Sequence, residues 1–292
     1  MTRAGATFPD LIDGGVLHNN PIEIALKEAM RLSETNRLLK TPDIVLSLGT
    51  GLPERYRYGF EAVSGYGYVG TPSRGPWLRD LFTAISYQVK LNLDTQSRWK
   101  RELEKSPFQT RMYRINPDLK KDPPKMDAKS EVPSLEPLVA GLFKENAELQ
   151  LKITTVACIL VASTFYFEKE GNPVSTSGSS AEVYGYIKCR MSNESEDMEK
   201  LGRFLQQCRG KSASFLMHNN PQQNIKDQEI RIPVDEMIQN NNYTPPRIKI
   251  DIVGDEVETV IYLKLPRLCE GRSLFPISGL PRALMKYDFG PK

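Results

Sequence analysis

An aspartate followed by two glycines is the feature of this sequence best suited to chemistry. Asp13, Gly14 and Gly15 come directly after the apolar pair Leu11 and Ile12. Glycine adopts backbone angles that other residues avoid and lets another group approach closely, so a carboxylate on this turn can be directed at a neighbour. Without further context, an Asp-Gly-Gly segment is more often an ordinary turn.

A helix is expected to begin soon after this turn. Asn20 suits the N-cap position, and Pro21 suits the first helical position because its missing N–H is not needed there. Apolar residues then recur at helical spacing, at Ile22, Ala25, Ala29 and Leu32. The turn is therefore predicted to lead into a capped helix.

The first half of the chain, residues 1–157, mixes short apolar runs with helical periodicity. This pattern is typical of an α/β layer fold. The expected elements are a buried strand at 43–48 that ends in a glycine-containing loop, a helix from Trp77 toward Trp99, a strand at 108–115, a surface loop at 120–133 and a helix from about Leu135 or Leu138 toward Thr154. Trp99 is expected to pack in the core rather than at a membrane.

The second half, residues 158–292, contains short β-type runs separated by polar turns. It predicts a mainly antiparallel domain, either a sandwich or a small barrel. The expected runs are 159–167, 184–191, 213–217, 229–234, 248–253 and 257–265, with a short helix at 198–208 and a loop at 170–181. The runs 248–253 and 257–265 alternate across Gly254 and Asp255, which predicts a hairpin.

Charge and composition exclude several kinds of function. The 292 residues include 39 basic and 36 acidic side chains, a net charge of +3 that does not favour a nucleic-acid partner. Four scattered cysteines and two histidines predict reduced core thiols and no metal site. An intracellular, cytoplasmic location is expected, because the sequence shows neither a signal peptide nor a run of about 20 apolar residues.

The surroundings of the Asp-Gly-Gly turn closely resemble the second signature of the patatin-like phospholipase family. After Asp13, Gly14 and Gly15 come three residues and then an Asn-Asn-Pro that opens a helix. The strand and glycine loop at 45–51 and the segment 113–117 follow in the family's order. The resemblance covers roughly residues 8–160. The second half more loosely resembles a C-terminal module found in some fungal members.

The resemblance implies a lipid acyl hydrolase with a three-layer α/β/α fold and a Ser–Asp dyad. In the family, the serine lies in a G-x-S-x-G elbow, and the aspartate of Asp-Gly-Gly takes its proton. Carried onto this chain, Asp13 is the dyad acid, with Gly14 and Gly15 as its turn and Asn20 and Pro21 as the helix cap. The implied partners are a phospholipid or acylglycerol substrate and a membrane surface, with no cofactor.

The chain departs from the family because it contains no G-x-S-x-G and no glycine-rich oxyanion loop. Both precede the aspartate in the family, and 12 residues precede Asp13 here. We therefore expect a truncated α/β/α domain over 1–157 that is inactive by itself, since an acid without its nucleophile forms no acyl-enzyme. Loss of neighbouring strands would expose apolar sheet residues, including Ile44, Val45 and Leu46.

Two functions of different class stay open. The chain is either the acid-bearing part of a lipid acyl hydrolase or a non-catalytic binding or regulatory module derived from that family. An upstream coding segment with G-x-S-x-G favours the first, and a genuine start at Met1 with a well-folded product favours the second. A scaffold unrelated to lipids would leave the pattern at residues 13–21 unexplained.

Overall fold

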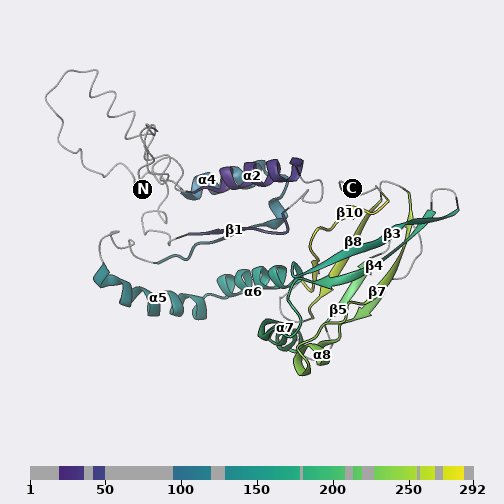
Figure 1. Ribbon diagram of the computed structural model, residues 1–292. Coiled ribbons are helices and arrows are strands. Elements are labelled where there is room, and N and C mark those ends of the chain that lie inside the picture. Colours follow the sequence, from purple (N-terminus) through teal and green to yellow (C-terminus); the bar gives the residue numbers. More distant parts are fainter. Residues whose placement is uncertain are drawn as a thin grey trace, which may run out of the picture.

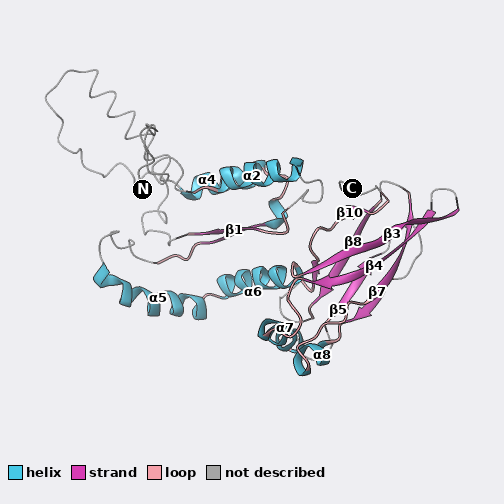
Figure 2. Ribbon diagram, in the orientation of Figure 1, coloured by secondary structure: helices cyan, strands magenta, loops and turns pink. Residues whose placement is uncertain are grey.

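The computed structural model combines helices with a small parallel sheet and two antiparallel sheets (Figures 1 and 2). The structure describes residues 20–35, 42–49, 95–119, 129–177, 180–207, 213–218, 227–254, 257–266 and 272–285. The general α/β class is confirmed, since helices and both kinds of strand pairing occur in these ranges. The sequence motif Asp13, Gly14 and Gly15 lies outside the described residues.

The parallel pair belongs to the first half of the chain. β1 (Val45–Leu48) runs parallel to β2 (Met112–Ile115), so that Ser47 lies opposite Arg114. One face is covered by α2 (Ile22–Thr35) and α4 (Thr95–Lys105) (Figure 1). Their shared core consists of Ile22, Leu26, Trp99 and Met112, with Val45, Leu103 and Phe108 packed against it. Trp99 is 6% exposed, which confirms its expected place in the core.

Two helices follow where the sequence predicts one. α5 (Val132–Glu145) and α6 (Ala147–Ala162) are separated at Asn146, which has extended backbone angles. The Asn146 side chain accepts a hydrogen bond of 3.0 Å from the Leu149 N–H. An asparagine that satisfies a free N–H in this way starts a new helix, and this explains the break.

Helix α6 also extends further than predicted. The run 159–167 was expected to be of β type, but helix continues to Ala162 and β3 begins at Phe165. Cys158, Ile159 and Ala162 are all buried, and this spacing matches one face of a helix. A short apolar run cannot be assigned to helix or strand from its periodicity. The proposed domain boundary between residues 157 and 158 lies inside α6.

The second half forms two antiparallel sheets. The first has the order β3-β4-β7, from β3 (Phe165–Ser177), β4 (Ser180–Cys189) and β7 (Arg247–Val253). The second has the order β10-β8-β5-β6, with β9 also paired to β8. Its strands are β5 (Ser214–His218), β6 (Gln228–Arg231), β8 (Glu258–Lys264), β9 (Leu274–Pro276) and β10 (Arg282–Ala283).

The two sheets share one apolar core. Alternate residues of β4 and β7 are buried, as expected when one face of each strand is covered. The Phe165 ring of β3 meets the Phe215 ring of β5 edge-on, with 5.1 Å between centroids. Short helices α7 (Glu196–Gln206) and α8 (Val234–Gln239) add Met198, Leu201, Leu205 and Met237 to this core. The arrangement agrees with the sandwich expected from the sequence.

Two details of the sandwich differ from prediction. Strands β7 and β8 do not form a hairpin, because β7 pairs with β4 while β8 pairs with β5, β9 and β10. Alternation of apolar and polar residues identifies a strand but not its partner. The hairpin predicted across Gly254 was therefore wrong. The expected loop at 170–181 is strand wherever the structure describes it, since residues 170–177 belong to β3 and residues 180–181 to β4, with a register shift between Glu170 and Val174.

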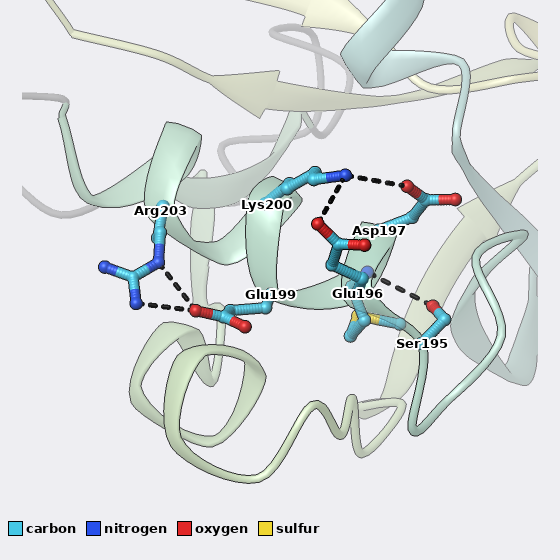
Figure 3. Close-up of polar contacts among 7 residues, drawn as sticks. Ser195, Glu196, Asp197, Glu199, Lys200 and Arg203 are labelled. Atoms are coloured by element: carbon cyan, nitrogen blue, oxygen red, sulfur yellow. Dashed lines mark hydrogen bonds and ion pairs between the residues drawn. The ribbon is translucent and has the colours of Figure 1, made fainter.

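The predicted helix near residues 198–208 is present as α7, with its polar face turned to solvent (Figure 3). The Ser195 hydroxyl oxygen caps it by accepting from the Met198 N–H at 3.2 Å. Lys200 lies between Glu196 and Asp197, and Arg203 bonds Glu199 (Figure 3). Exposed pairs of this kind add little stability, so the buried face holds the helix in place.

The two halves of the structure are joined by α6 and by a set of polar contacts. Helix α6 packs against both β2 and β9. The Asp43 carboxylate accepts from the Gly279 N–H at 3.0 Å. The Arg111 guanidinium donates to the carbonyl oxygens of Pro42 and Leu280 at 2.9 and 3.1 Å. These bonds fix the start of β1 and β2 against the loop that follows β9.

Among the residues described, no helix is long and apolar enough to cross a membrane. The apolar helix α6 has 16 residues, fewer than the roughly 20 that a membrane-spanning helix requires.

Two glycine-to-alanine substitutions should have opposite effects. A Cβ at Gly185 would overlap the Glu168 carbonyl oxygen and the Phe167 ring, whereas a Cβ at Gly141 in α5 would meet nothing within 4 Å. We expect Gly185→Ala to lower the free energy of unfolding by about 1–3 kcal/mol, and Gly141→Ala to raise it by up to about 1 kcal/mol. Urea unfolding of both variants tests this. Equal effects would show that the close approach at Gly185 is not structurally important.

Candidate functional site

Polar side chains gather at the carboxyl ends of the two parallel strands. Ser47 and Arg114 are each the penultimate residue of their strand and lie in register. Because side chains alternate along a strand, Arg114 shares the face of Met112, which is buried against α2 and α4. This edge of a parallel sheet is where α/β proteins place their ligands.

Arg114 is the centre of this group. Its Nη1 donates to the Ser47 hydroxyl oxygen at 2.6 Å. Its Nη2 donates to the Thr95 hydroxyl oxygen at 3.1 Å, and its Nε donates to the Gln96 side-chain oxygen at 3.0 Å. The guanidinium therefore ties β1, β2 and the start of α4 together, and it does so through uncharged oxygens.

Burial lowers the pKa of the Arg114 guanidinium from its ordinary value, because removal from water disfavours the charged form. The group still carries its charge, since arginine is not deprotonated in proteins. The site therefore contains a partly buried positive charge.

Asn20 links the start of α2 to the same group. Its side-chain oxygen accepts from the Ile22 N–H at 3.3 Å, an interaction typical of an N-cap, and its amide donates to the Thr95 carbonyl oxygen at 3.1 Å. The N–H of Ala25 donates to the Pro21 carbonyl oxygen at 2.9 Å, so Pro21 lies in the first turn. Asn20 is 5% exposed, its bond to the Ile22 N–H is buried, and its bond to the Thr95 carbonyl is partly buried.

Gly49 lets the strand ends approach each other. Its N–H donates to the Ile115 carbonyl oxygen at 2.9 Å. A Cβ at this position would overlap the Asn116 side chain. The residue is therefore required for close contact at the carboxyl edge of the sheet, whereas the sequence indicated only a break in the strand.

The residues predicted from the sequence are thus placed in part. Asn20 and Pro21 lie at the start of α2, whereas Asp13, Gly14 and Gly15 are outside the described ranges. Sequence reasoning assigned no role to Ser47, Thr95, Gln96 or Arg114. A usable signal was present, because Arg114 is a charged residue on the inward face of a short strand, and buried charges are rare without partners.

A second charged region lies on the outer face of the β3-β4-β7 sheet, and its charges compensate one another. Lys249 donates to Glu182 at 2.8 Å, and the Tyr184 hydroxyl donates to the same carboxylate at 2.7 Å. These two bonds lower the pKa of the Glu182 carboxyl. Arg247 pairs with Glu170 at 2.8 Å and lies over the Tyr184 ring. Such a paired, hydrated face has no evident chemistry.

Thiols and metal ligands offer no further site in the described ranges. Cys158 is buried, and burial raises the pKa of the Cys189 thiol, which makes it less reactive. No cluster of three or more histidine, cysteine, aspartate or glutamate side chains occurs there in a position to hold a metal ion.

Comparisons of the chain with protein families, curated proteins and solved structures found no match. The function must therefore be argued from the sequence motif and from the site just described.

The link between Asn20 and Thr95 can be tested with a pair of substitutions. Asn20→Asp keeps the oxygen that caps α2 but replaces the amide donor with an oxygen facing the Thr95 carbonyl. We expect a loss of about 1–3 kcal/mol in unfolding free energy. Asn146→Asp is the control, since Asn146 is exposed and only its oxygen is used. Equal melting temperatures for the two variants would contradict the role of the Asn20 amide.

Proposed function

We propose that this chain carries the acid-bearing part of a patatin-like lipid acyl hydrolase. In this proposal, residues 1–157 belong to a truncated three-layer α/β/α domain, and residues 158–292 form its β-rich companion. Asp13 on the Gly14 and Gly15 turn is the acid of a Ser–Asp dyad.

One observation carries the proposal. Asn20, seven residues after Asp13 in the sequence, is bonded to Thr95 and so joins the Arg114 group at the carboxyl edge of the parallel strands. Helices α2 and α4 cover one face of these strands (Figure 1), and helix α6 also packs against β2. A motif that leads into this edge is suitably situated for chemistry, because loops at the carboxyl ends of strands form the sites of α/β enzymes.

The proposed reaction follows from the residue types. A serine hydroxyl attacks the ester carbonyl of a phospholipid or acylglycerol while its proton passes to the Asp13 carboxylate. The proton then goes to the departing alcohol oxygen, and water releases the fatty acid from the acyl-enzyme. Since this chain contains no G-x-S-x-G, the serine must come from another stretch of polypeptide, and the chain by itself should be inactive.

The proposal places the protein inside the cell, in the cytoplasm, with access to membrane surfaces. The thiol of Cys189, which forms no disulfide within the described ranges, supports a reducing compartment.

Hydrolysis assays with substitutions at Asp13 test the dyad. The transcript upstream of Met1 is sequenced first, and a reading frame with an in-frame G-x-S-x-G is expressed. We expect Asp13→Asn in that protein to reduce kcat for a phospholipid ester by about 10³-fold or more. Asp10→Asn, three residues away, is the control and should retain activity. A stop codon just upstream, or an active Asp13→Asn variant, would refute the hydrolase proposal for this chain.

A second proposal, a non-catalytic binding module, is favoured by the exposure of β1. In the described part of the chain β1 pairs with β2 on one side, while Leu48 is 71% exposed and Leu46 is 37% exposed. Ile44 and Val45 are partly buried, so the expected exposure of this strand holds for Leu46 and not for the other two. Exposed apolar side chains such as these favour association with another polypeptide.

Association through this edge should depend on Leu48. We expect the chain to self-associate with rising concentration in sedimentation velocity, and Leu48→Lys to reduce that association without lowering the melting temperature. Val132→Lys is a control at a similarly exposed position on α5, where Val132 is 60% exposed. A wild-type chain that is monomeric and melts cooperatively would contradict self-association through β1.

A further inference from the structure

Within the described ranges, Arg114 is one of several arginines whose hydrogen-bond partners are uncharged, as those of Arg190 and Arg272 also are. Exposed cations such as Arg203 and Lys249 have carboxylate partners. Arg114, which is partly buried, is bonded within the described ranges to two hydroxyls and one amide oxygen. A cation withdrawn from water is costly unless an anion compensates it. The structure thus contains a partly buried positive charge that a bound anion would compensate.

The partners of Arg114 also determine which hydrogen-bond groups are left. Ser47 and Thr95 each accept a bond from the guanidinium, so each keeps its O–H to donate elsewhere. Gln96 accepts through its oxygen, so its amide hydrogens are likewise available. Arg114 itself has five N–H groups, of which three are used by described residues. The group therefore offers donors from three elements and few free acceptors.

This array lies at a place where anions bind readily. Ser47 and Arg114 are at the carboxyl ends of parallel strands, and Thr95 is the first residue of the 11-residue helix α4. The first turn of a helix carries the positive end of the helix dipole, which favours an anion. Arg111 differs, because its partners include the backbone carbonyls of Pro42 and Leu280. A carbonyl has no hydrogen to donate to a ligand, whereas a hydroxyl or an amide does.

We propose that Ser47, Thr95, Gln96 and Arg114 form a binding site for a phosphate group. Donors that come from β1, β2 and α4 suit the several oxygens of a phosphate better than the two oxygens of a carboxylate. The phosphate can be a small soluble compound or the head group of a phospholipid. The site needs neither Asp13 nor a nucleophile, so it does not depend on the proposed hydrolase function.

Thermal unfolding in inorganic phosphate tests the site. At constant ionic strength, replacing chloride by phosphate should raise the melting temperature of the wild-type chain, because a ligand of the folded state stabilises it. Arg114→Gln should lose this rise. Arg203→Gln is the control, since it removes an arginine that is exposed and paired on α7 (Figure 3). General salt effects act on all three proteins alike, so equal rises, or none in the wild type, would overturn the proposal.

A direct titration covers the case in which Arg114→Gln fails to fold. Ser47→Ala removes one donor and leaves the charge in place. Calorimetric titration with inorganic phosphate should then show an affinity at least about tenfold weaker than that of the wild type. An unchanged affinity would exclude this group as the binding site.

Vesicles separate the two sources of phosphate. Phosphatidylcholine vesicles are compared with vesicles that also contain phosphatidic acid, with and without competing inorganic phosphate. Binding that requires phosphatidic acid, is displaced by phosphate and is lost in Arg114→Gln supports a lipid head group. Binding of phosphate without any binding to vesicles supports a soluble phosphate compound. Asp13→Asn should bind phosphate as the wild type does, so loss of hydrolysis and loss of this site are distinguishable.

Discussion

Burial of helix α6 on more than one side is the constraint on which the rest of the structure depends. Its sequence is apolar around most of its circumference, and Val156, Cys158 and Ile159 are almost completely buried. Part of the helix still reaches water at Leu151 and Leu160, which are 40% and 47% exposed. The helix packs against β2 of the parallel pair and β9 of the sandwich, and so it positions both halves of the chain. The bonds of Arg111 and Asp43 add polar contacts between the same two halves.

The fold could be predicted best where side chains alternate along a strand. Residues 181–187 and 248–252 read as strands because every second residue is buried in one shared core. Strand partners could not be predicted, since alternation reports which face of β7 is covered and not which strand lies beside it. The end of α6 could not be predicted either, because a mostly apolar helix end and a buried strand have the same apolar composition.

The site shows a similar division between local and distant effects. The position of Asn20 in front of α2 follows from neighbouring residues, since capping is a local interaction. The Arg114 group depends on Ser47, which is 67 residues away in the sequence, and no short-range pattern reports such a contact. Asp13 and its glycines remain a prediction from the sequence, while the residues around Arg114 come from the structure.

The separation of β1 from β2 has a consequence for the order of folding. Strand β1 has four residues, and its partner is 67 residues further along the chain. Closing so long a loop costs chain entropy, and this cost comes before the pairing of the four residues contributes any stabilisation. The β3-β4 hairpin and the neighbouring α5-α6 pair, by contrast, join residues close in sequence. We expect the sandwich and α6 to form first and to serve as the template on which the parallel pair assembles, so that the anion site is completed last.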